Sequence, residues 1–251
     1  MNAKDRISKA YEQMNEAADT LRALADDLED AADGLLYIQT EEMEQTEPLD
    51  GFAAVHELLH SGKRPALGQM IHAALQDGRV AKWRIIDTES MAALPDSGVR
   101  PVVAQLAEIL DYRPFSRPDK AHPWGWNDYS ASELAAWLDD EFAKQLAEDD
   151  FHCIVSRGGL GTWHRKIWLL SAEEAGFESL SRAFGWYASG IEEERCKRRE
   201  LVDSDGDAAY WWLRTPYSGY AYNVRIVNTS GALDYSDASS ANGVAPACII
   251  G

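Results

Sequence analysis

The distribution of tryptophans is the feature that most constrains how this chain folds. The sequence has 251 residues and nine tryptophans, and the first of them is Trp83. Tryptophan side chains bury large apolar areas, so a set confined to one part of a chain indicates one hydrophobic core. We therefore expect a single aromatic-rich domain in the C-terminal two hundred residues, built around Trp83, Trp124, Trp126, Trp137, Trp163, Trp168, Trp186, Trp211 and Trp212.

The first 45 residues follow a different pattern. Residues 1–50 hold four Lys+Arg and fourteen Asp+Glu, a net charge of 4 − 14 = −10. A seven-residue apolar repeat predicts a helix whose seam packs against other helices. We expect residues 1–48 to form an acidic helix and linker that joins protomers as a coiled coil; a helix hairpin or a helix docked on its own domain is the alternative. The repeat consists of Ile7, Met14, Leu21, Leu28 and Leu35.

Charge and composition exclude several classes of partner. The formal net charge of −18 repels phosphate backbones, so nucleic acid is not an expected partner. No stretch of eighteen apolar residues occurs, and the charged N-terminus lacks the apolar core of a signal peptide, so we expect no membrane insertion and no signal peptide. The three cysteines, Cys153, Cys196 and Cys248, are odd in number and lack zinc-knuckle spacing, which predicts free thiols.

Residues 49–251 combine helical and strand patterns and predict the α+β class, with helices early and strands late. The expected helices cover 53–60, 67–75 and 130–146, and the expected strands cover 81–87 and 166–170. Ser130 and Ser132 are candidate N-caps. Ser171 and Glu174 have the spacing of a capping box that opens a further helix.

Two short motifs suggest metal binding. His56-Glu57-Leu58-Leu59-His60 is an HExxH pattern, which in zinc hydrolases places two imidazoles and a general base on one helix face. Lys63 and Ala66 stand where an extended motif has its glycine and third histidine, so we prefer an amphipathic helix and keep a zinc hydrolase as the alternative. Residues 203–207, Asp-Ser-Asp-Gly-Asp, space three carboxylates as calcium loops do, but Gly206 comes too early for an EF-hand and Arg214 stands where the final glutamate would be. We prefer a solvated acidic turn there and keep structural calcium as the alternative. We expect no metal, no cofactor and no catalytic residues.

Residues 217–240 have an unusual composition. Four Tyr, five Ser, two Gly, two Asn and two Asp make up fifteen of these twenty-four residues, with no Lys and no Glu. Tyrosine offers rigid contact area and small polar residues offer adaptable hydrogen bonds, as in antibody paratopes. Apolar residues such as Trp211, Val224 and Ile250 frame the segment and favour a scaffolded recognition surface over loose turns.

Five segments, in this order, resemble the variable proteins of diversity-generating retroelements. The resemblance covers about residues 50 to 251 and implies a C-type-lectin-like domain, related to formylglycine-generating enzymes and used for binding. The segments are Asn127-Asp128-Tyr129-Ser130 with Trp137-Leu138, Ile167-Trp168-Leu169-Leu170-Ser171, Tyr210-Trp211-Trp212-Leu213-Arg214-Thr215-Pro216, Val227-Asn228-Thr229-Ser230-Gly231, and Asn242-Gly243-Val244-Ala245-Pro246-Ala247.

In that family a reverse transcriptase rewrites adenines near the 3′ end of the gene, and the altered codons change the residues of the binding face. The resemblance therefore implies a variable region at about 210–251. Its ligand-binding face would comprise Tyr217, Ser218, Tyr220, Tyr222, Ile226, Ser230, Ala232, Asp234, Tyr235, Ser236, Asp237, Ser239 and Ser240.

These observations together predict a non-enzymatic recognition protein. Residues 49–251 would form the C-type-lectin-like domain, and residues 1–48 would assemble homo-oligomers that raise affinity through avidity. The expected partner is a protein or glycan on a cell surface. The expected location is a phage tail or the cytoplasm. A lectin-like module with a fixed ligand or a structural role is a second alternative.

Overall fold

The computed structural model describes residues 14, 17–18, 20–22, 24, 47–156 and 165–251. The chain divides into two compact units, residues 1–46 and 47–251. In the first unit the described residues are helical, and Met14, Leu21 and Leu24 expose their side chains. The rest of the predicted helix, and with it the coiled coil, lies outside the described residues.

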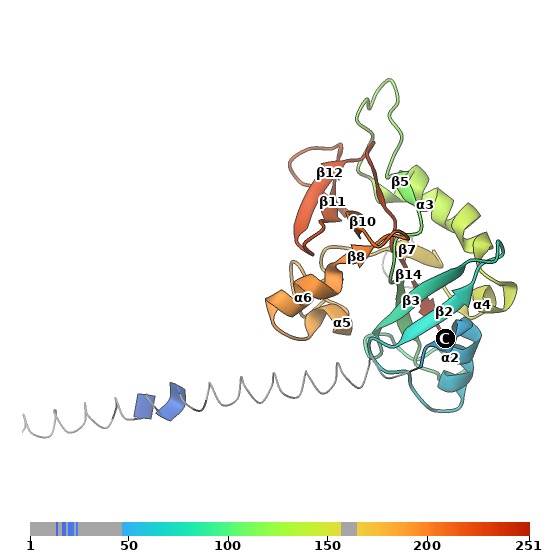
Figure 1. Ribbon diagram of the computed structural model, residues 1–251, viewed down its shortest axis with the longest axis vertical. Coiled ribbons are helices and arrows are strands. Elements are labelled where there is room, and N and C mark those ends of the chain that lie inside the picture. The colour runs from blue at the N-terminus through green and yellow to red at the C-terminus, as the bar shows by residue number, and fades with distance from the viewer. Residues whose placement is uncertain (1–13, 15–16, 19, 23, 25–46, 157–164) are drawn as a thin grey trace, which may run out of the picture. The chain divides into compact units, whose positions relative to one another are not determined.

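Residues 47–251 mix helices and sheets, as the α+β prediction requires (Figure 1). A seven-stranded sheet has β14 near its centre, hydrogen-bonded on one side to β4 and on the other to both β6 and β7. All pairs in this sheet are antiparallel except β1 with β2. Its strands are β1 (Leu49–Asp50), β2 (Met70–Ala74), β3 (Val80–Asp87), β4 (Val102–Leu106), β6 (Ile154–Val155), β7 (Ile167–Leu169) and β14 (Pro246–Ile250).

A five-stranded sheet has the order β12-β11-β10-β13-β5, which leaves β12 and β5 as its two edges. Its strands are β5 (Tyr112–Pro114), β10 (Trp211–Pro216), β11 (Asn223–Val227), β12 (Leu233–Asp237) and β13 (Ala241–Gly243). A separate hairpin pairs β8 (Leu201–Val202) with β9 (Ala208–Ala209).

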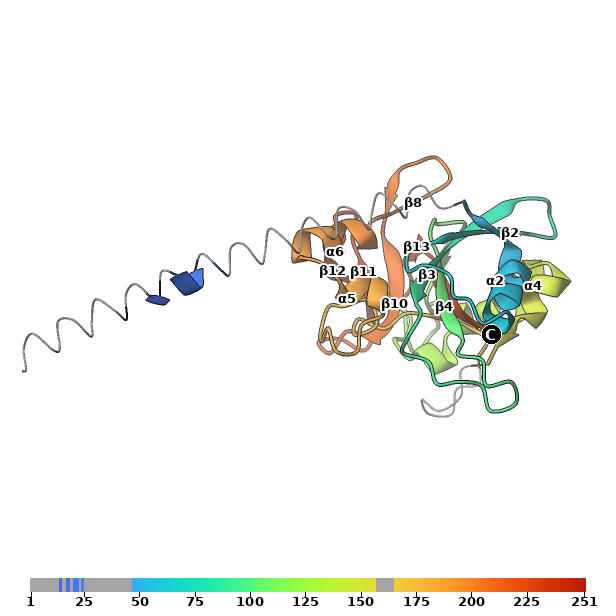
Figure 2. The same cartoon turned by 90° about the horizontal axis from the view of Figure 1, so that it is seen from below.

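Short helices surround the sheets. The first, α2, lies beside α4 and β2, and Phe52 of α2 packs edge-on against Trp83 at a ring-centroid distance of 5.1 Å (Figure 1). Helix α6 lies beside the turn between β11 and β12, where buried Arg199 donates to the carbonyl of Gly231, and α5 lies beside α6 and β3 (Figure 2). The helices are α2 (Gly51–His60), η1 (Tyr129–Ala131), α3 (Glu133–Trp137), η2 (Leu138–Phe142), η3 (Ala143–Gln145), α4 (Glu148–His152), α5 (Gly185–Ala188) and α6 (Glu192–Arg199).

The helix predicted at 53–60 and the strands predicted at 81–87 and 166–170 are confirmed as α2, β3 and β7. The predicted order of helices before strands is wrong, because β2, β3 and β4 precede most helices. The predicted helix at 67–75 is also wrong. That segment forms β2, because Ile71, Ala73 and Leu75 are buried at every second residue and pair with β3, which is a strand's period.

The helix predicted at 130–146 is broken into η1, α3, η2 and η3. Ser132 is confirmed as an N-cap, since its Oγ accepts from the backbone N–H of Ala135. Ser130 is not a cap and donates to Asp128 instead. Ser171 and Glu174 make both reciprocal capping bonds, yet only turns follow, and Gly176 there has φ +78°.

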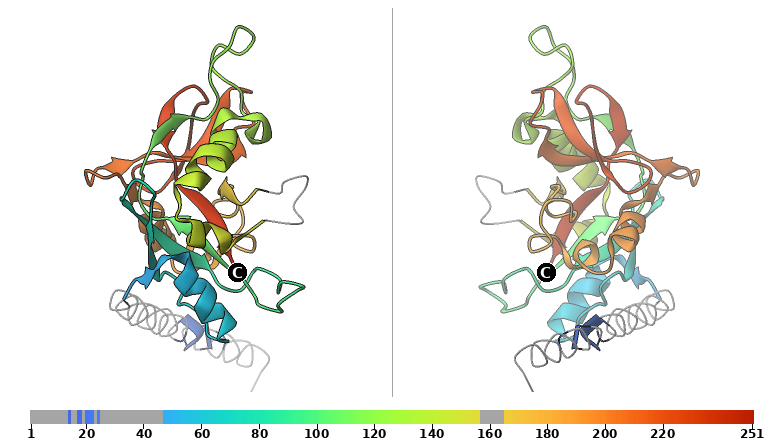
Figure 3. Two further views of the ribbon diagram at one scale, coloured as in Figure 1. Left: turned by 90° about the vertical axis from the view of Figure 1, so that its right-hand side faces the viewer. Right: turned by 90° about the vertical axis from the view of Figure 1, so that its left-hand side faces the viewer.

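Most tryptophans are in the core, as predicted. Six of the eight described tryptophans are at least 91% buried, and Trp83, Trp168, Trp211 and Trp212 are almost wholly inaccessible. Trp163 lies outside the described residues. The prediction is wrong for Trp124 and Trp126, which are 56% and 41% exposed. Both belong to the loop of residues 115–128, which projects from the domain between β5 and η1 (Figure 3).

Candidate binding surface

Four tyrosines that the sequence placed on the binding face form one group, here named the tyrosine cluster: Tyr217, Tyr220, Tyr222 and Tyr235. Tyr217 stacks on Tyr235 with ring centroids 4.3 Å apart and an interplanar angle of 13°. Tyr220 stacks on Tyr222 at 5.4 Å, and the rings of Tyr217 and Tyr220 are 6.4 Å apart. Tyr220 and Tyr235 are 55% and 45% exposed, so the cluster presents aromatic area to solvent.

The loop that carries three of these tyrosines is held by one asparagine. The Nδ2 of Asn127 lies 3.1 Å from the carbonyl oxygens of Tyr220 and Asn223, and its backbone N–H donates to Ala221 at 3.0 Å. Gly219 lets the loop fold closely over Tyr217, because a Cβ there would lie 2.5 Å from that ring. The tyrosines are therefore displayed on a fixed backbone, which lowers the entropy lost on binding.

Strand geometry divides the predicted binding residues. Successive side chains of a strand point to opposite faces, so Asp234 and Ser236 lie on the other face of β12 from Tyr235 and Asp237. Ile226 is paired with Asp234 in register and is 3% exposed. The assignment of Ile226 to the binding face is therefore wrong, because its side chain packs in the core.

The remaining predicted residues lie at both ends of the β11–β12 hairpin. Ser218 is exposed beside the tyrosine cluster, and Ser239 and Ser240 are half-buried in the turn after β12. Ser230 and Ala232 lie in the opposite turn, where their backbone N–H groups donate to Asn228. The structure thus groups the residues near the tyrosine cluster and separates Ser230 and Ala232 from them.

Composition alone did not reveal Arg225 beside the tyrosine cluster or the two tryptophans of the loop that precedes Asn127. The guanidinium carbon of Arg225 lies 4.8 Å from the ring centroid of Tyr217. Trp124 accepts a backbone hydrogen bond from Ser239, and Trp126 lies beside Asn127. In the sequence, only the order Trp124-Gly125-Trp126 marks this loop. In the structure, Gly125 has φ +81°, and a Cβ there would approach Ser116 and Ala238.

A groove with a volume of about 500 Å³ opens next to this surface. Arg214 and Glu174 form an ion pair at its wall, with the Nη2 of Arg214 2.8 Å from Glu174 Oε1. The residues lining it are Trp126, Asn127, Asp128, Tyr129, Ser171, Arg214, Thr215 and Pro216.

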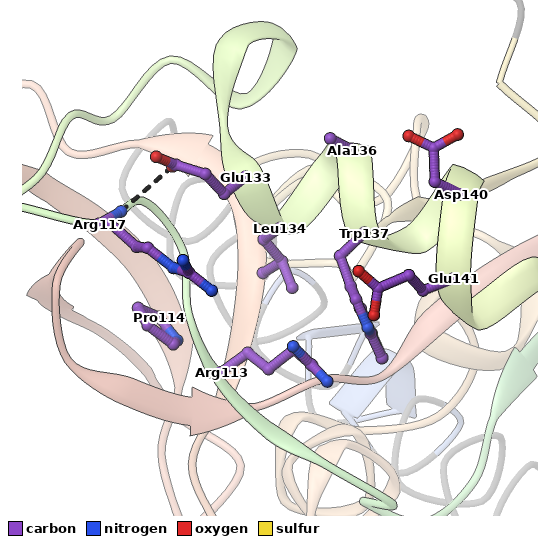
Figure 4. Close-up of a pocket in the computed structure, with 9 residues that line it drawn as sticks. All are labelled: Arg113, Pro114, Arg117, Glu133, Leu134, Ala136, Trp137, Asp140 and Glu141. Atoms are coloured by element: carbon purple, nitrogen blue, oxygen red, sulfur yellow. Dashed lines mark hydrogen bonds between the residues drawn. The ribbon is translucent and has the colours of Figure 1, made fainter.

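A second pocket, of about 240 Å³, lies between β5 and α3–η2 (Figure 4). The guanidinium of Arg113 lies over Trp137, 4.0 Å from the ring centroid, and its Nε pairs with Asp111 at 2.9 Å. Glu133 accepts from the backbone N–H of Arg117, and Asp140 and Glu141 lie at the other end. No histidine, serine or cysteine lines this pocket, so its lining offers no side-chain nucleophile of those types.

The two metal motifs have other contacts in the structure. His56 Nδ1 lies 2.7 Å from the carbonyl oxygen of Gly251, and the His56 and His60 rings are 4.1 Å apart. Asp203 accepts from the hydroxyl of Tyr112, which lowers the pKa of that carboxyl group, and from two backbone N–H groups of its own turn. Within the described ranges, no three His, Cys, Asp or Glu side chains gather as metal ligands.

All three cysteines are free, as predicted, and Cys153 and Cys248 are buried. No helix in the described parts of the chain is long and apolar enough to cross a membrane. Residues 106–251 match a family model described as "Domain of unknown function (DUF6273)". No curated protein and no solved structure matches the chain.

Proposed function

Since this chain belongs to the DUF6273 family, whose description assigns no activity, we propose its function from the geometry of the binding surface. We propose that it is a non-enzymatic recognition protein that binds a target through the tyrosine cluster. The observation that carries this proposal is the stacked group of four tyrosines, of which Tyr220 and Tyr235 are exposed, on a backbone held by Asn127.

The energetic argument follows from what exposed tyrosines do in interfaces. Tyrosine is enriched among residues whose truncation costs binding energy, and each well-packed anchor contributes roughly 1–2 kcal/mol or more. Serine and aspartate side chains around the cluster would satisfy the polar groups of the target. The affinity per site is expected to be modest, and assembly through residues 1–48 would raise it by avidity.

The wider identity in this proposal is a C-type-lectin-like variable protein of a diversity-generating retroelement. It is supported by the residue order between Asn127 and Ala247 and by the at least partial exposure of most residues in 217–240. The target would be a protein or glycan on a cell surface, and the phage tail would be the place of action. The DNA beside the gene tests this identity: a near-copy of the 3′ end differing at adenines, next to a reverse-transcriptase gene, is expected. A locus without both contradicts the retroelement identity.

Binding by the tyrosine cluster is tested with two tyrosines of equal exposure. Tyr235, in the cluster, and Tyr210, outside it, are each 45% exposed. The full chain is used to select binders from a phage-displayed peptide library and from a glycan array. Tyr235→Ser should weaken the selected binders about tenfold, whereas Tyr210→Ser should leave them unchanged. Binders insensitive to Tyr235→Ser and Tyr217→Ser, or no binders from either source, would contradict the proposal.

A further inference from the structure

The groove of about 500 Å³ beside the tyrosine cluster contains a second kind of recognition chemistry. Its volume falls within the roughly 300–1,000 Å³ of small-ligand sites. Asn127 links the two surfaces, because its side chain lines the groove and also binds the carbonyl oxygens of Tyr220 and Asn223. A target seated on the tyrosine cluster would therefore reach the groove.

One wall of the groove is an exposed indole in a fixed position. Trp126 is 41% exposed, and the ring of His122 contacts it edge-on at a centroid distance of 4.5 Å. On either side of it, Gly125 fits closely against Ser116 and Ala238, and Asn127 is hydrogen-bonded to the tyrosine loop. An aromatic face held in this way attracts cations through its quadrupole.

The charges of the lining favour a cation. Asp128 is exposed, and its Oδ1 accepts from the N–H and hydroxyl of Ser130. Its Oδ2 makes no hydrogen bond to any residue in the described ranges. The other charged residue of the lining, Arg214, is paired with Glu174. The formal charges of Asp128, Arg214 and Glu174 thus give a net charge of −1.

The surroundings carry the same sign. Asp237 is half-buried at the end of β12, pairs in register with Asn223, whose carbonyl oxygen accepts from Asn127, and forms no ion pair with described residues. The whole chain has a net charge of −18, which accelerates association with basic partners. Arg225 is a cation beside the tyrosine cluster, and its guanidinium is placed over Tyr217.

We propose that the groove binds an arginine or lysine side chain of a basic polypeptide target, with the cationic head between Trp126 and Asp128 and the stem along Pro216. This inference rests on the proposed function, because it makes the groove part of the binding surface that contains the tyrosine cluster. It also narrows the target class to polypeptides with exposed basic residues.

An isosteric pair of probes tests the charge requirement directly. Nα-acetyl-arginine amide and its neutral isostere Nα-acetyl-citrulline amide are titrated into the ¹⁵N-labelled full chain. The arginine probe should shift the indole N–H signal of Trp126, assigned with Trp126→Phe, and the citrulline probe should bind at least about threefold more weakly. Equal binding of the two probes, or shifts confined to other indoles, would overturn the proposal.

Matched variants locate the site. Asp128→Asn keeps the acceptor for Ser130 and should weaken the arginine probe by about two- to fivefold, the range of exposed ion pairs. Asp96→Asn, at another exposed aspartate, should not weaken it, and Trp124→Phe is the control for Trp126→Phe. Raising NaCl from about 50 to 500 mM should also weaken binding by the unaltered chain, which tests the charge requirement without a variant. Salt-independent binding, or equal losses in Asp128→Asn and Asp96→Asn, would count against the groove.

The two proposals fail separately. Arginine binding at Trp126 without tyrosine-dependent library binders refutes the proposed function and leaves the groove as a cation site. Tyrosine-dependent binders without a preference for arginine over citrulline refute the groove and leave the proposed function.

Discussion

Two strands near the C-terminus differ in what surrounds them. β12 ends at Asp237 and has no fully buried residue, whereas β14 begins at Pro246 and is buried at every position. The difference arises from position in the sheets, because β12 is an edge strand and β14 pairs on both sides. Side chains of β12 can therefore be exchanged with little loss of folding free energy, whereas exchanges in β14 should destabilise the fold strongly.

The largest contrast is expected between core and exposed tryptophans. Trp211 in β10 is 0% exposed and donates to the carbonyl of Arg199, while Trp124 is 56% exposed. Trp211→Ala should lower the free energy of unfolding by about 3–5 kcal/mol through lost burial and cavity formation. Trp124→Ala should change it by less than about 0.5 kcal/mol. Urea denaturation of both variants measures these values, and similar losses would remove the distinction between the regions.

Adjacent glutamates provide the second contrast. Glu174 pairs with Arg214 where both side chains are mostly buried, and Glu173 pairs with Arg182 at 3.0 Å in solvent. Glu174→Ala should destabilise the fold by about 3 kcal/mol, because the guanidinium is left buried without its carboxylate. Glu173→Ala should cost no more than about 1 kcal/mol. Thermal unfolding of the two variants compares them, and a larger loss for Glu173→Ala would show that burial does not control these pairs.

Substitutions at two glycines distinguish the stability cost of backbone strain from that of steric crowding. Gly125 and Gly78 have φ of +81° and +87°, but of the two only Gly125 would bring an added Cβ within 4 Å of neighbouring atoms. Gly78→Ala should cost about 1 kcal/mol from the left-handed backbone alone. Gly125→Ala should cost roughly 1 kcal/mol more and displace Trp124 and Trp126, which indole NMR signals would report. Unchanged indole signals would mean that the loop accommodates the methyl group.

The smallest effect concerns two exposed tyrosines of the five-stranded sheet. Partial burial and the hydrogen bond to Asp203 raise the pKa of Tyr112 to about 12. The described contact of Tyr235 is of another kind, the stacking of its ring on Tyr217. A phenol with a raised pKa in the folded state loses its stabilising contribution as pH rises from about 10 to 12. Asp203→Asn should lower the Tyr112 pKa, and NMR titration of the ring carbons measures it. A pKa unchanged by Asp203→Asn would assign the shift to burial and to the charges of Asp207 and Asp205.

Local patterns were sufficient for part of the fold. The helix at α2, the strands β3 and β7 and the buried positions of six tryptophans follow from periodicity and hydrophobicity in the printed sequence. The segment around β2 was assigned wrongly, because a short apolar run fits a helix or a strand and pairing with β3 decides between them. Likewise, the reciprocal bonds of Ser171 and Glu174 form without a helix after them, and Glu174 also binds Arg214.

For the binding surface, composition identified the tyrosines, and register sorted their neighbours. The sequence assigned Ile226 to the binding face together with the tyrosines, and only its place on β11 shows that it is buried. Trp126 and Asp128 are distant in sequence from residues 217–240, so no local pattern joins them to that segment. The hydrogen bonds of Asn127 bring them together.

The amino-acid sequence by itself determined that residues 217–240 are rich in tyrosine and small polar side chains and that large aromatic residues frame them. Those properties depend on residue type, which is local information. The tertiary structure decided which side chains are accessible, that four tyrosines stack, and that Trp126, Asp128 and Pro216 line one groove. These properties depend on strand register and long-range hydrogen bonds, which form only when distant segments pack together.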